Sequence, residues 1–405
     1  MIYEFPMIQH LDDVRDAIKD SPEFIVVQKD GYQVVNYVVM SEETFPAVNV
    51  AGGSAEMRKE RALRARLRRE CRGLIFDMEG KIINRRYHKF FNVNEREETA
   101  AHRLNWSAPH VILEKLDGSM VSPCVVGGNV RWMTKMGITD TSMEAEVFVA
   151  QHPDYVEFAE RYLSHGMTPI FEWCSRKQRI VVDYPEDQLV LIAMRRNVTG
   201  EYLPYDVLSF NGDYWHIPVV KTYDGTTSNM ESLIADARGR EDQEGYIIRF
   251  DDGHMLKIKG DWYVRIHKTK DNLTLEKNVV DLLVNEKVDD AKAFMLEDDR
   301  KRVEEFEDKF WHGVAEVTRL YEDYFHVVIR NQNMDRREWA MTHLDVVKKQ
   351  NVFSPQIIFG MFDGKKVHDL IVDAIRKNTG TQTRIDGVRH LWRGARWSYH
   401  FEGDN

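Results

Sequence analysis

The stretch ILEKLDGSM, residues 112–120, places Lys115, Asp117 and Gly118 between two apolar runs. Taken alone, an Asp-Gly pair beside an exposed lysine is typical of an ordinary hairpin turn. The strand-like runs on both sides favour a β-rich region around it. Whether Lys115 has a chemical role depends on which other charged residues the fold brings to it.

Short alternating or apolar runs continue on both sides of this stretch, from residue 73 to about 266. Residues 55–72 differ, because they have helix-forming composition and carry eight Lys or Arg. A solvated helix face and a contact with a polyanion are equally good interpretations of this basic run. Four segments each predict a strand, a turn and a second strand: residues 24–40, 73–92, 121–135 and 189–203.

The pattern changes after about residue 267. From residue 270 to 354 there is no proline and one glycine, Gly313, and apolar residues recur at spacings of three and four, as in amphipathic helices. We therefore expect an α+β protein. It would have a domain of antiparallel sheets with helices at residues 1–268 and an all-helical domain at residues 269–405.

The composition is that of a globular protein, with 43% hydrophobic and 30% charged residues among 405. The sequence contains no run of eighteen apolar residues, so no membrane span is expected. The N-terminal residues include acids and no apolar stretch, so no signal peptide is expected. Three cysteines without CxxC spacing argue against disulfides and structural zinc, so a cytoplasmic protein is expected. A net charge of −10 argues against nonspecific coating of nucleic acid but leaves room for a local basic groove.

Residues 244–263, EGYIIRFDDGHMLKIKGDWY, predict a second hairpin. With Asp252 and Gly253 as its two loop residues, Tyr246 pairs with Lys259, and Glu244, Tyr246, Lys257 and Lys259 share one face. Two lysines on one strand face repel each other, and a bound anion would remove that repulsion. The alternative, that these lysines only face solvent, is the better interpretation of this segment by itself.

Other charged residues stand at strand or loop edges: Arg72, Lys89, Lys135 and Glu172. The sequence has neither a GxxxxGK loop nor a GxGxxG turn, so backbone loops of those types do not hold a nucleotide here. Phosphates would have to be bound by basic side chains. Taken singly, Glu172 is usually just a carboxylate at the rim of a sheet.

Taken in order, EKLDG (114–118), FEW (171–173), EGYIIR (244–249) and LKIK (256–259) resemble the motifs of the covalent nucleotidyltransferases. CRGLIF, KFFNVNE, RIVVDYPEDQLVLIAMR and KIKGDWYVRIHKTK are similar to the narrower T4 RNA ligase 1 family, over most of residues 30–270. The resemblance implies an N-terminal nucleotidyltransferase domain with ATP-grasp-like sheets, and a helical domain that selects the RNA. The basic run at 55–70 is longer than expected for this family.

The resemblance also implies an ATP-dependent RNA ligase that acts in three steps. Lys115 attacks ATP and becomes lysyl-AMP, the AMP passes to an RNA 5′-phosphate, and an RNA 3′-hydroxyl then displaces it. Neighbouring cations would lower the pKa of the nucleophilic lysine. Small residues after Lys115 would let a phosphate approach the backbone.

The implied partners are ATP, Mg²⁺, for which Mn²⁺ can substitute, and RNA with 5′-phosphate and 3′-hydroxyl ends, tRNA-like or broken in a loop. The chain is expected to act as a monomer, in the cytoplasm of an infected host if it is phage-encoded. The residues that match the family's catalytic positions are Lys115, Glu172, Glu244, Lys257 and Lys259. Those that match its nucleotide-binding positions are Tyr37, Arg72, Lys89, Lys115, Glu172, Glu244, Lys257 and Lys259.

Further positions follow from the same resemblance. Asp117 and Gly118 belong to the lysine motif, Lys135 fits a position implicated in end joining, and Tyr263 fits another essential position. The metal-associated carboxylates are Glu172, Glu244 and Asp289, although Asp289 reads equally well as an acid at a helix start.

Several alternatives remain open at the level of sequence. The main alternative is a catalytically idle RNA-binding protein of the same fold. The presence of every charged residue that the three steps require argues against it. A DNA ligase or a GTP-using capping enzyme normally has an OB-fold after LKIK, where this chain predicts helices. An enzyme that adenylylates proteins is not favoured by any specific feature. The tail at 389–405 mixes Arg with Trp and Tyr, which suits either RNA stacking or burial of the aromatic side chains.

Overall fold

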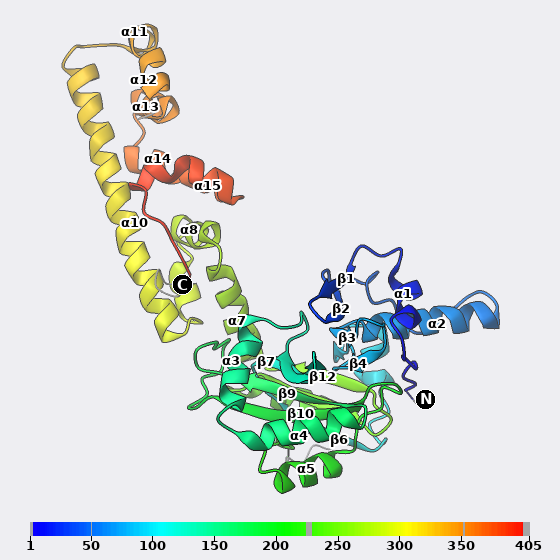
Figure 1. Ribbon diagram of the computed structural model, residues 1–405. Coiled ribbons are helices and arrows are strands. Elements are labelled where there is room, and N and C mark those ends of the chain that lie inside the picture. Colours follow the sequence, from blue (N-terminus) through cyan, green and yellow to red (C-terminus); the bar gives the residue numbers. More distant parts are fainter. Residues whose placement is uncertain (1–2, 50, 224–228, 351–352, 400–405) are drawn as a thin grey trace. The chain divides into compact units, whose positions relative to one another are not determined.

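The computed structural model describes residues 3–49, 51–223, 229–350 and 353–399. The chain divides into two compact units, Met1–Val264 and Arg265–Asn405. The division falls within helix α7 (Asp261–Leu273), near the boundary expected after residue 268. Unit 1 is built on antiparallel sheets and unit 2 from helices (Figure 1). The α+β fold class with a helical C-terminal part is therefore confirmed.

Three four-stranded sheets form the frame of unit 1. The first has the order β1 (Phe24–Lys29), β2 (Tyr32–Tyr37), β3 (Leu74–Phe76), β4 (Ile82–Asn84). The second has the order β10 (Gln188–Arg196), β9 (Met167–Cys174), β7 (Ser119–Val126), β8 (Asn129–Met133). The third has the order β5 (Phe91–Asn92), β12 (Met255–Lys259), β11 (Gly245–Phe250), β6 (His110–Lys115). Neighbouring strands are antiparallel except for the parallel pair β5 and β12.

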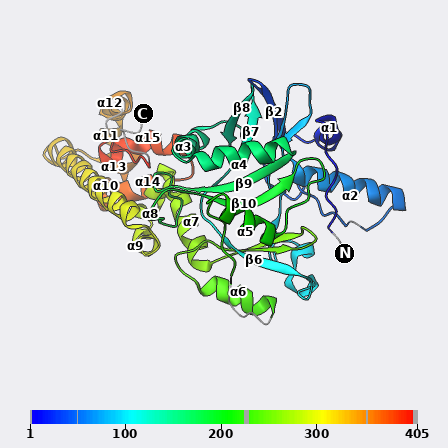
Figure 2. The ribbon, with the colours of Figure 1, turned by 60° about the horizontal axis from the view of Figure 1, so that its bottom comes forward.

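The helices of unit 1 cover the outer faces of these sheets. Helices α3 (Asp140–Val149), α4 (Pro153–Ser164) and α5 (Tyr205–Tyr214) pack on the second sheet (Figure 2). Phe158 of α4 and Leu208 of α5 share one apolar cluster with Phe171 and Trp173 of β9. Helix α6 (Met230–Gly239) packs on β11 and β12, and α1 (Asp12–Ile18) packs on α2 (Ala55–Glu70).

Unit 2 is built around the 28-residue helix α10 (Glu297–Tyr324). Around it lie α8 (Glu276–Val284), α9 (Val288–Lys292), a π-helical turn (Phe325–Arg330), α11 (Arg336–Thr342), α12 (Leu344–Gln350), α13 (Pro355–Phe362), α14 (Val367–Arg376) and α15 (Gln382–Val388). The C-terminal tail docks on this helix: a Cβ on Gly313 would lie 2.4 Å from the carbonyl oxygen of Trp392. Trp392 and Trp397 are buried, so burial is the correct interpretation of these two aromatic residues. Residues 400–405 lie outside the described range.

Most of the predicted strand pairs form. Residues 24–40, 73–92 and 121–135 contain the hairpins β1–β2, β3–β4 and β7–β8. In residues 189–203 the chain also turns back antiparallel to β10, through a bridge between Arg195 and Tyr202 and a hydrogen bond from the Leu203 N–H to the Met194 carbonyl, but this return is too short to form a second named strand. Among the described residues, no helix has the length and apolar character needed to span a membrane.

Candidate active site

Lys115 is the last residue of β6, and the segment after it connects two different sheets. β6 pairs with β11, whereas β7, which begins at Ser119, pairs with β8 and β9. The simple reading of Lys-Leu-Asp-Gly as a hairpin turn is therefore wrong, because the flanking strands are not partners. The turn sends the chain from the third sheet to the second and leaves Lys115 between them.

Asp117 and Gly118 hold this connection in place. Asp117 is buried, and its Oδ2 accepts hydrogen bonds from the backbone N–H groups of Val181 and Val182 at 2.7 and 2.8 Å. Its Oδ1 accepts one from the Tyr263 hydroxyl at 2.7 Å. A Cβ on Gly118 would lie 2.4 Å from the carbonyl oxygen of Trp173, so only glycine lets the connection lie this close to β9. Glycine is thus required at position 118 because the backbone there packs closely against β9. The expected approach of a phosphate to this backbone stays a prediction.

Glu244 joins two lysines at the end of this sheet. Its Oε2 lies 2.6 Å from Nζ of Lys115 and its Oε1 lies 2.9 Å from Nζ of Lys259. The carboxylate is buried, with 5% of the side chain exposed. Gly245, the next residue, pairs with both Lys115 and Lys259 and has φ +146°. A Cβ there would lie 2.0 Å from the carbonyl oxygen of Ile258, so glycine is required beside Glu244.

The predicted register of the hairpin at 244–263 is wrong by one residue. The Phe250 N–H donates to the His254 carbonyl at 2.9 Å, so the loop has three residues and not two. Gly253 has φ +89°, as expected for such a loop. Lys259 therefore pairs with Gly245, and Tyr246 pairs with Ile258. The two lysines do share a face, but Tyr246 lies on the opposite one.

A cavity of about 380 Å³ lies around Lys115, between the sheets of unit 1. All eight predicted nucleotide-binding residues line it: Tyr37, Arg72, Lys89, Lys115, Glu172, Glu244, Lys257 and Lys259. Gly118 lines it as well, whereas Asp117 and Tyr263 lie behind it and support the connection. The structure thus gathers into one cavity residues that lie 222 positions apart, from Tyr37 to Lys259.

Sequence reasoning missed the apolar part of this cavity. Its apolar lining residues include Leu113, Met120, Ile192, Val220 and Ile247. Such side chains can hold the flat face of a nucleobase. Nothing in the sequence separates them from other buried strand residues, because their position depends on how two sheets face each other.

The cations in and beside this cavity fall into two groups. Lys115 and Lys259 share the single carboxylate of Glu244. For Arg72, Lys89 and Lys257, and for Lys135 just outside the lining, no ion pair is described within the residues that the structure covers. Arg72 and Lys89 instead contact the sulfur atoms of Met120 and Met40, and Lys135 lies 5.1 Å from the centre of the Tyr37 ring. Positive charge without a partner favours a polyanionic ligand.

Burial and these charges shift several pKa values. Burial, together with the charges of Lys89 and Lys115, lowers the pKa of Lys257 to about 7. Burial also lowers the pKa of Lys89. Burial raises the pKa of Tyr37, but Arg72, Lys135 and Lys89 together bring it below its usual value. Lowered lysine pKa values are thus found at Lys257 and Lys89.

Glu172, on β9, has the opposite shift. Burial, aided by the negative charge of Glu244 and opposed by the attraction of Lys115, raises its pKa to about 7. Within the described residues, no hydrogen bond or ion pair to its carboxylate is found. A cation bound beside it would favour the ionised form.

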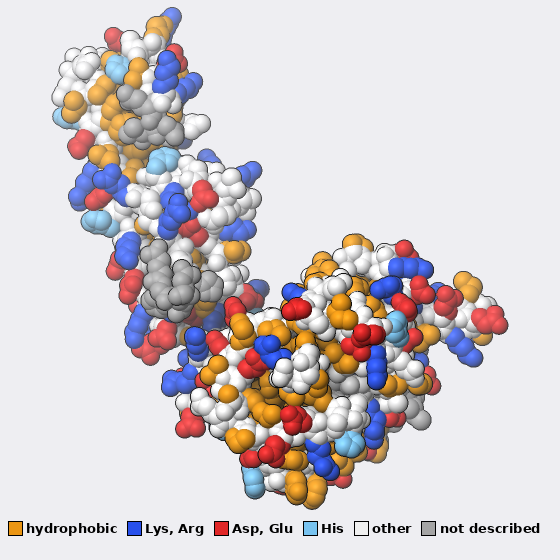
Figure 3. Space-filling view, in the orientation of Figure 1, with side chains coloured by type: hydrophobic (Ala, Val, Ile, Leu, Met, Phe, Trp, Pro, Cys, Tyr) orange, Lys and Arg blue, Asp and Glu red, His pale blue; other side chains and the backbone are white. Residues whose placement is uncertain are grey.

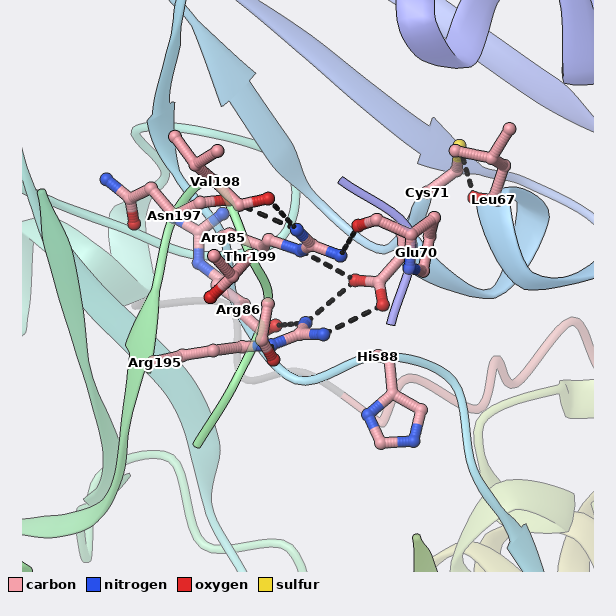
Figure 4. Close-up of polar contacts among 12 residues, drawn as sticks. Leu67, Glu70, Cys71, Arg85, Arg86, His88, Arg195, Asn197, Val198 and Thr199 are labelled. Carbon is pink, nitrogen blue, oxygen red and sulfur yellow. Dashed lines mark hydrogen bonds and ion pairs between the residues drawn. The ribbon is translucent and has the colours of Figure 1, made fainter. Parts of the chain in front are cut away.

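A buried ionic cluster fixes the segment that carries Lys89. Glu70, at the end of α2, pairs with Arg85 at 3.0 Å and with Arg195 of β10 at 2.8 Å (Figure 4). Arg85 also donates to the carbonyl oxygens of Pro6 and Val198, both at 2.9 Å. The three charged side chains are fully buried or nearly so, and each has several partners. Such satisfied networks hold one backbone arrangement.

Two predicted residues lie outside the cavity lining. Lys135 follows β8 and reaches the cavity only through the ring of Tyr37. Asp289 is in unit 2, in the first turn of α9, where its side chain is 89% exposed and lies 3.5 Å from Lys292. The described residues contain no group of three His, Cys, Asp or Glu side chains that could hold a metal ion. The metal role of Asp289 therefore stays a prediction.

The four predicted motifs meet around one lysine-centred cavity, as the resemblance to covalent nucleotidyltransferases implies. Residues 70–263, just under half of the chain, match the family described as RNA ligase, of the T4 RNA ligase 1 type. The predicted resemblance to this family is confirmed over these residues.

Two curated relatives and one solved structure illustrate the likeness. A Thermovibrio ammonificans protein, provisionally named an RNA ligase, is 34% identical over 242 residues, which cover 56% of this chain and 61% of that protein. RNA ligase 1 of bacteriophage TS2126 is 23% identical over 210 residues, or 49% of this chain and 51% of that one. This chain thus spans less than two thirds of either relative. An archaeal ATP-dependent RNA ligase superposes with a TM-score of 0.43 and 14% identity, over 64% of each chain.

Proposed function

We propose that this protein is an ATP-dependent RNA ligase that joins a 5′-phosphate to a 3′-hydroxyl through lysyl-AMP and RNA-adenylate. The observation that carries the proposal is the position of Lys115, which lies at a strand end, in a cavity with an apolar wall and with cations for which no ion pair is described. The family match supplies independent support. A lysine with only a structural role would not need four further cations in the lining of the same cavity, which are Arg72, Lys89, Lys257 and Lys259.

Lys115 acts first as a nucleophile. A lysine with the usual pKa is neutral in only about one molecule in a thousand near pH 7.5. Oε2 of Glu244 accepts a hydrogen bond from Nζ at 2.6 Å and is the nearest group that can take its proton. The Nζ lone pair then forms the P–N bond to the α-phosphorus of ATP as the P–O bond to pyrophosphate breaks.

The two later steps use the same cavity. An oxygen of the RNA 5′-phosphate bonds to the adenylate phosphorus, the P–N bond breaks, and Nζ regains a proton. The 3′-hydroxyl of the second end then loses its proton and bonds to the 5′-phosphorus, and AMP leaves with the electron pair of the broken bond. Lys257 and Lys259 lie beside the reacting phosphorus and offset its charge in every step.

A divalent metal ion fits these residues. Mg²⁺ keeps several water and phosphate ligands and needs only one or two carboxylates from a protein. Glu172, whose carboxylate has no described partner, and Glu244 would hold it, directly or through water. When bound, the ion neutralises charge on the α-phosphate and on pyrophosphate.

We further propose that unit 2 selects the RNA, with a broken, tRNA-like loop as the substrate class. Unit 2 folds around its own apolar core and lies beyond the segment that matches the RNA ligase family. A separate folded unit that follows the ligation domain in the chain is suited to setting substrate choice.

Incubation with α-labelled ATP or GTP and Mg²⁺, followed by denaturing electrophoresis, tests the proposal. We expect acid-labile, alkali-stable label from ATP on the wild type and none on Lys115→Ala. Conversion of a 5′-phosphorylated RNA into a longer or circular product completes the test. Label from GTP alone would assign a capping reaction, and no label from either nucleotide would favour an idle RNA-binding protein.

A further inference from the structure

An exposed apolar strip begins where β2 ends. Val38, Val39 and Met40 follow Tyr37 directly and are 53%, 51% and 60% exposed. Three consecutive exposed apolar residues are unusual unless they bind something. The strip is also held in shape: the Val38 N–H donates to the Glu23 carbonyl at 2.7 Å, and the Thr44 hydroxyl donates to the Val39 carbonyl at 3.2 Å.

The strip is continuous with the mouth of the nucleotide cavity. Tyr37 and Met40 line that cavity, and Sδ of Met40 lies 3.0 Å from Nζ of Lys89. Hydrophobic side chains gather over the region of β1 and β2 in Figure 3, next to basic side chains. A ligand that suits this surface has a flat apolar part joined to an anionic part, which describes a nucleotide.

For the cations beside the strip, Arg72, Lys89 and Lys135, no ion pair with a carboxylate is described among the residues that the structure covers. Against the effect of burial, their charges bring the pKa of Tyr37 below its usual value, and Nζ of Lys135 lies 5.1 Å from the centre of the Tyr37 ring. Lys115 and Lys259, by contrast, share the carboxylate of Glu244. Apart from Lys257, the cations with no described carboxylate partner therefore lie on the side of the cavity that the strip borders.

The proposed reaction brings an RNA phosphate to the side opposite Nζ of Lys115. In an in-line displacement, the entering and leaving groups lie on opposite sides of the phosphorus. Pyrophosphate therefore leaves opposite Nζ of Lys115 in the first step. The RNA 5′-phosphate must enter opposite Nζ in the second step, because the P–N bond is then the one that breaks. The same set of cations can therefore hold pyrophosphate as it leaves and then receive the RNA 5′-phosphate.

From these observations we infer that Val38, Val39 and Met40 form the platform on which the first base at the 5′ end of the RNA lies. Its 5′-phosphate is then held by Arg72, Lys89 and Lys135. The inference rests on the proposed function and adds a base-contacting surface to it. An RNA strand is the occupant that the phosphate-binding cations and the continuity with the nucleotide cavity favour.

The test compares two double variants of the full-length protein. Val38→Ser/Val39→Ser changes the strip, and Val147→Ser/Val207→Ser changes two valines that are 64% and 37% exposed on helices α3 and α5. For the strip variant, we expect unchanged labelling by α-labelled ATP and an apparent KM for a 5′-phosphorylated RNA that rises about tenfold, as loss of one base contact predicts. The control variant should match the wild type in both assays.

A second substrate separates contact with the base from other effects. An RNA whose first nucleotide lacks its base should bind the wild type as weakly as normal RNA binds the strip variant. The two changes together should not add, because both remove the same contact. An unchanged KM in the strip variant, or fully additive effects, would overturn the inference while leaving the ligase assignment intact.

Other outcomes are also decisive. Loss of ATP labelling in the strip variant would make the strip part of the nucleotide site, against the inference. A wild type that forms dimers which the strip variant cannot form, with unchanged RNA affinity, would assign the strip to a second copy of the chain. A wild type that never takes label would refute the proposed function itself.

Discussion

Replacing Gly118 with alanine tests how the lysine is positioned. A Cβ at this position would lie 2.4 Å from the carbonyl oxygen of Trp173 and 3.1 Å from Cγ of Glu172. Carbon and oxygen atoms that are not bonded need more than 3.0 Å, so the connection and β9 must separate by several tenths of an ångström. Both neighbours are constrained, because Trp173 lies within the second sheet and Lys115 ends a strand of the third.

The expected result is a large loss of activity with a modest loss of stability. A displacement approaching 1 Å at a reacting group costs on the order of 100-fold in rate. Overpacking of this kind costs about 1–3 kcal/mol of unfolding free energy. The rate is measured by rapid-quench labelling with α-labelled ATP, and stability is measured by urea denaturation of the same preparation.

Gly239→Ala is the matched control. Gly239 ends α6, a Cβ there would meet nothing within 4 Å, and its backbone φ is not positive. This variant should label as fast as the wild type and be equally or slightly more stable. A Gly118→Ala protein that labels at the wild-type rate would refute the argument that close packing on β9 positions Lys115.

Three further predictions concern the groups that support this site. Glu70→Gln should lower the unfolding free energy by about 3–5 kcal/mol in urea denaturation at pH 7, because it leaves a buried arginine pair without its carboxylate; a change below about 1 kcal/mol would contradict the structural role of the cluster. Tyr263→Phe should slow labelling by about fivefold through loss of one hydrogen bond to Asp117, with little effect on the KM for ATP, and an unchanged rate would show that Asp117 needs no such support. Glu172→Gln should become more stable relative to the wild type as pH rises from 4 to 8. The pKa of Glu172 is about 7 in the folded state, above its value in the unfolded state, so the wild type loses stability while Glu172 ionises. A stability difference that is constant with pH would refute the raised pKa.

The motif residues of the site could be identified from the sequence because of their chemistry and order. A lysine in KLDG, a glutamate in FEW and two lysines in LKIK are rare residue types for strands, and all of them line one cavity. The hairpin of residues 24–40 and the helical unit were equally predictable. Their signals are local, since alternation and helical periodicity depend on residues close together in the chain.

The errors came from features that depend on contacts distant in sequence. Asp-Asp-Gly-His permits a loop of two or three residues. The strand pairing in the structure gives a loop of three, which places Tyr246 on the other face. The Asp-Gly after Lys115 has the signature of a hairpin, but β6 and β7 found partners in two different sheets. In both cases the sequence located a turn, but it did not determine the length of the turn or the strands that pair on either side of it.

The amino-acid sequence by itself determined the chemistry that this protein can perform: which lysine is available, which carboxylates accompany it, and where sheets give way to helices. The tertiary structure alone decided how charge is distributed among those residues. Glu244 pairs with both Lys115 and Lys259, whereas Arg72 and Lys89 contact methionine sulfur atoms and have no described ion pair. The reason is physical: electrostatic compensation and burial depend on distances of a few ångströms between residues far apart in the chain, and only the packed sheets set those distances.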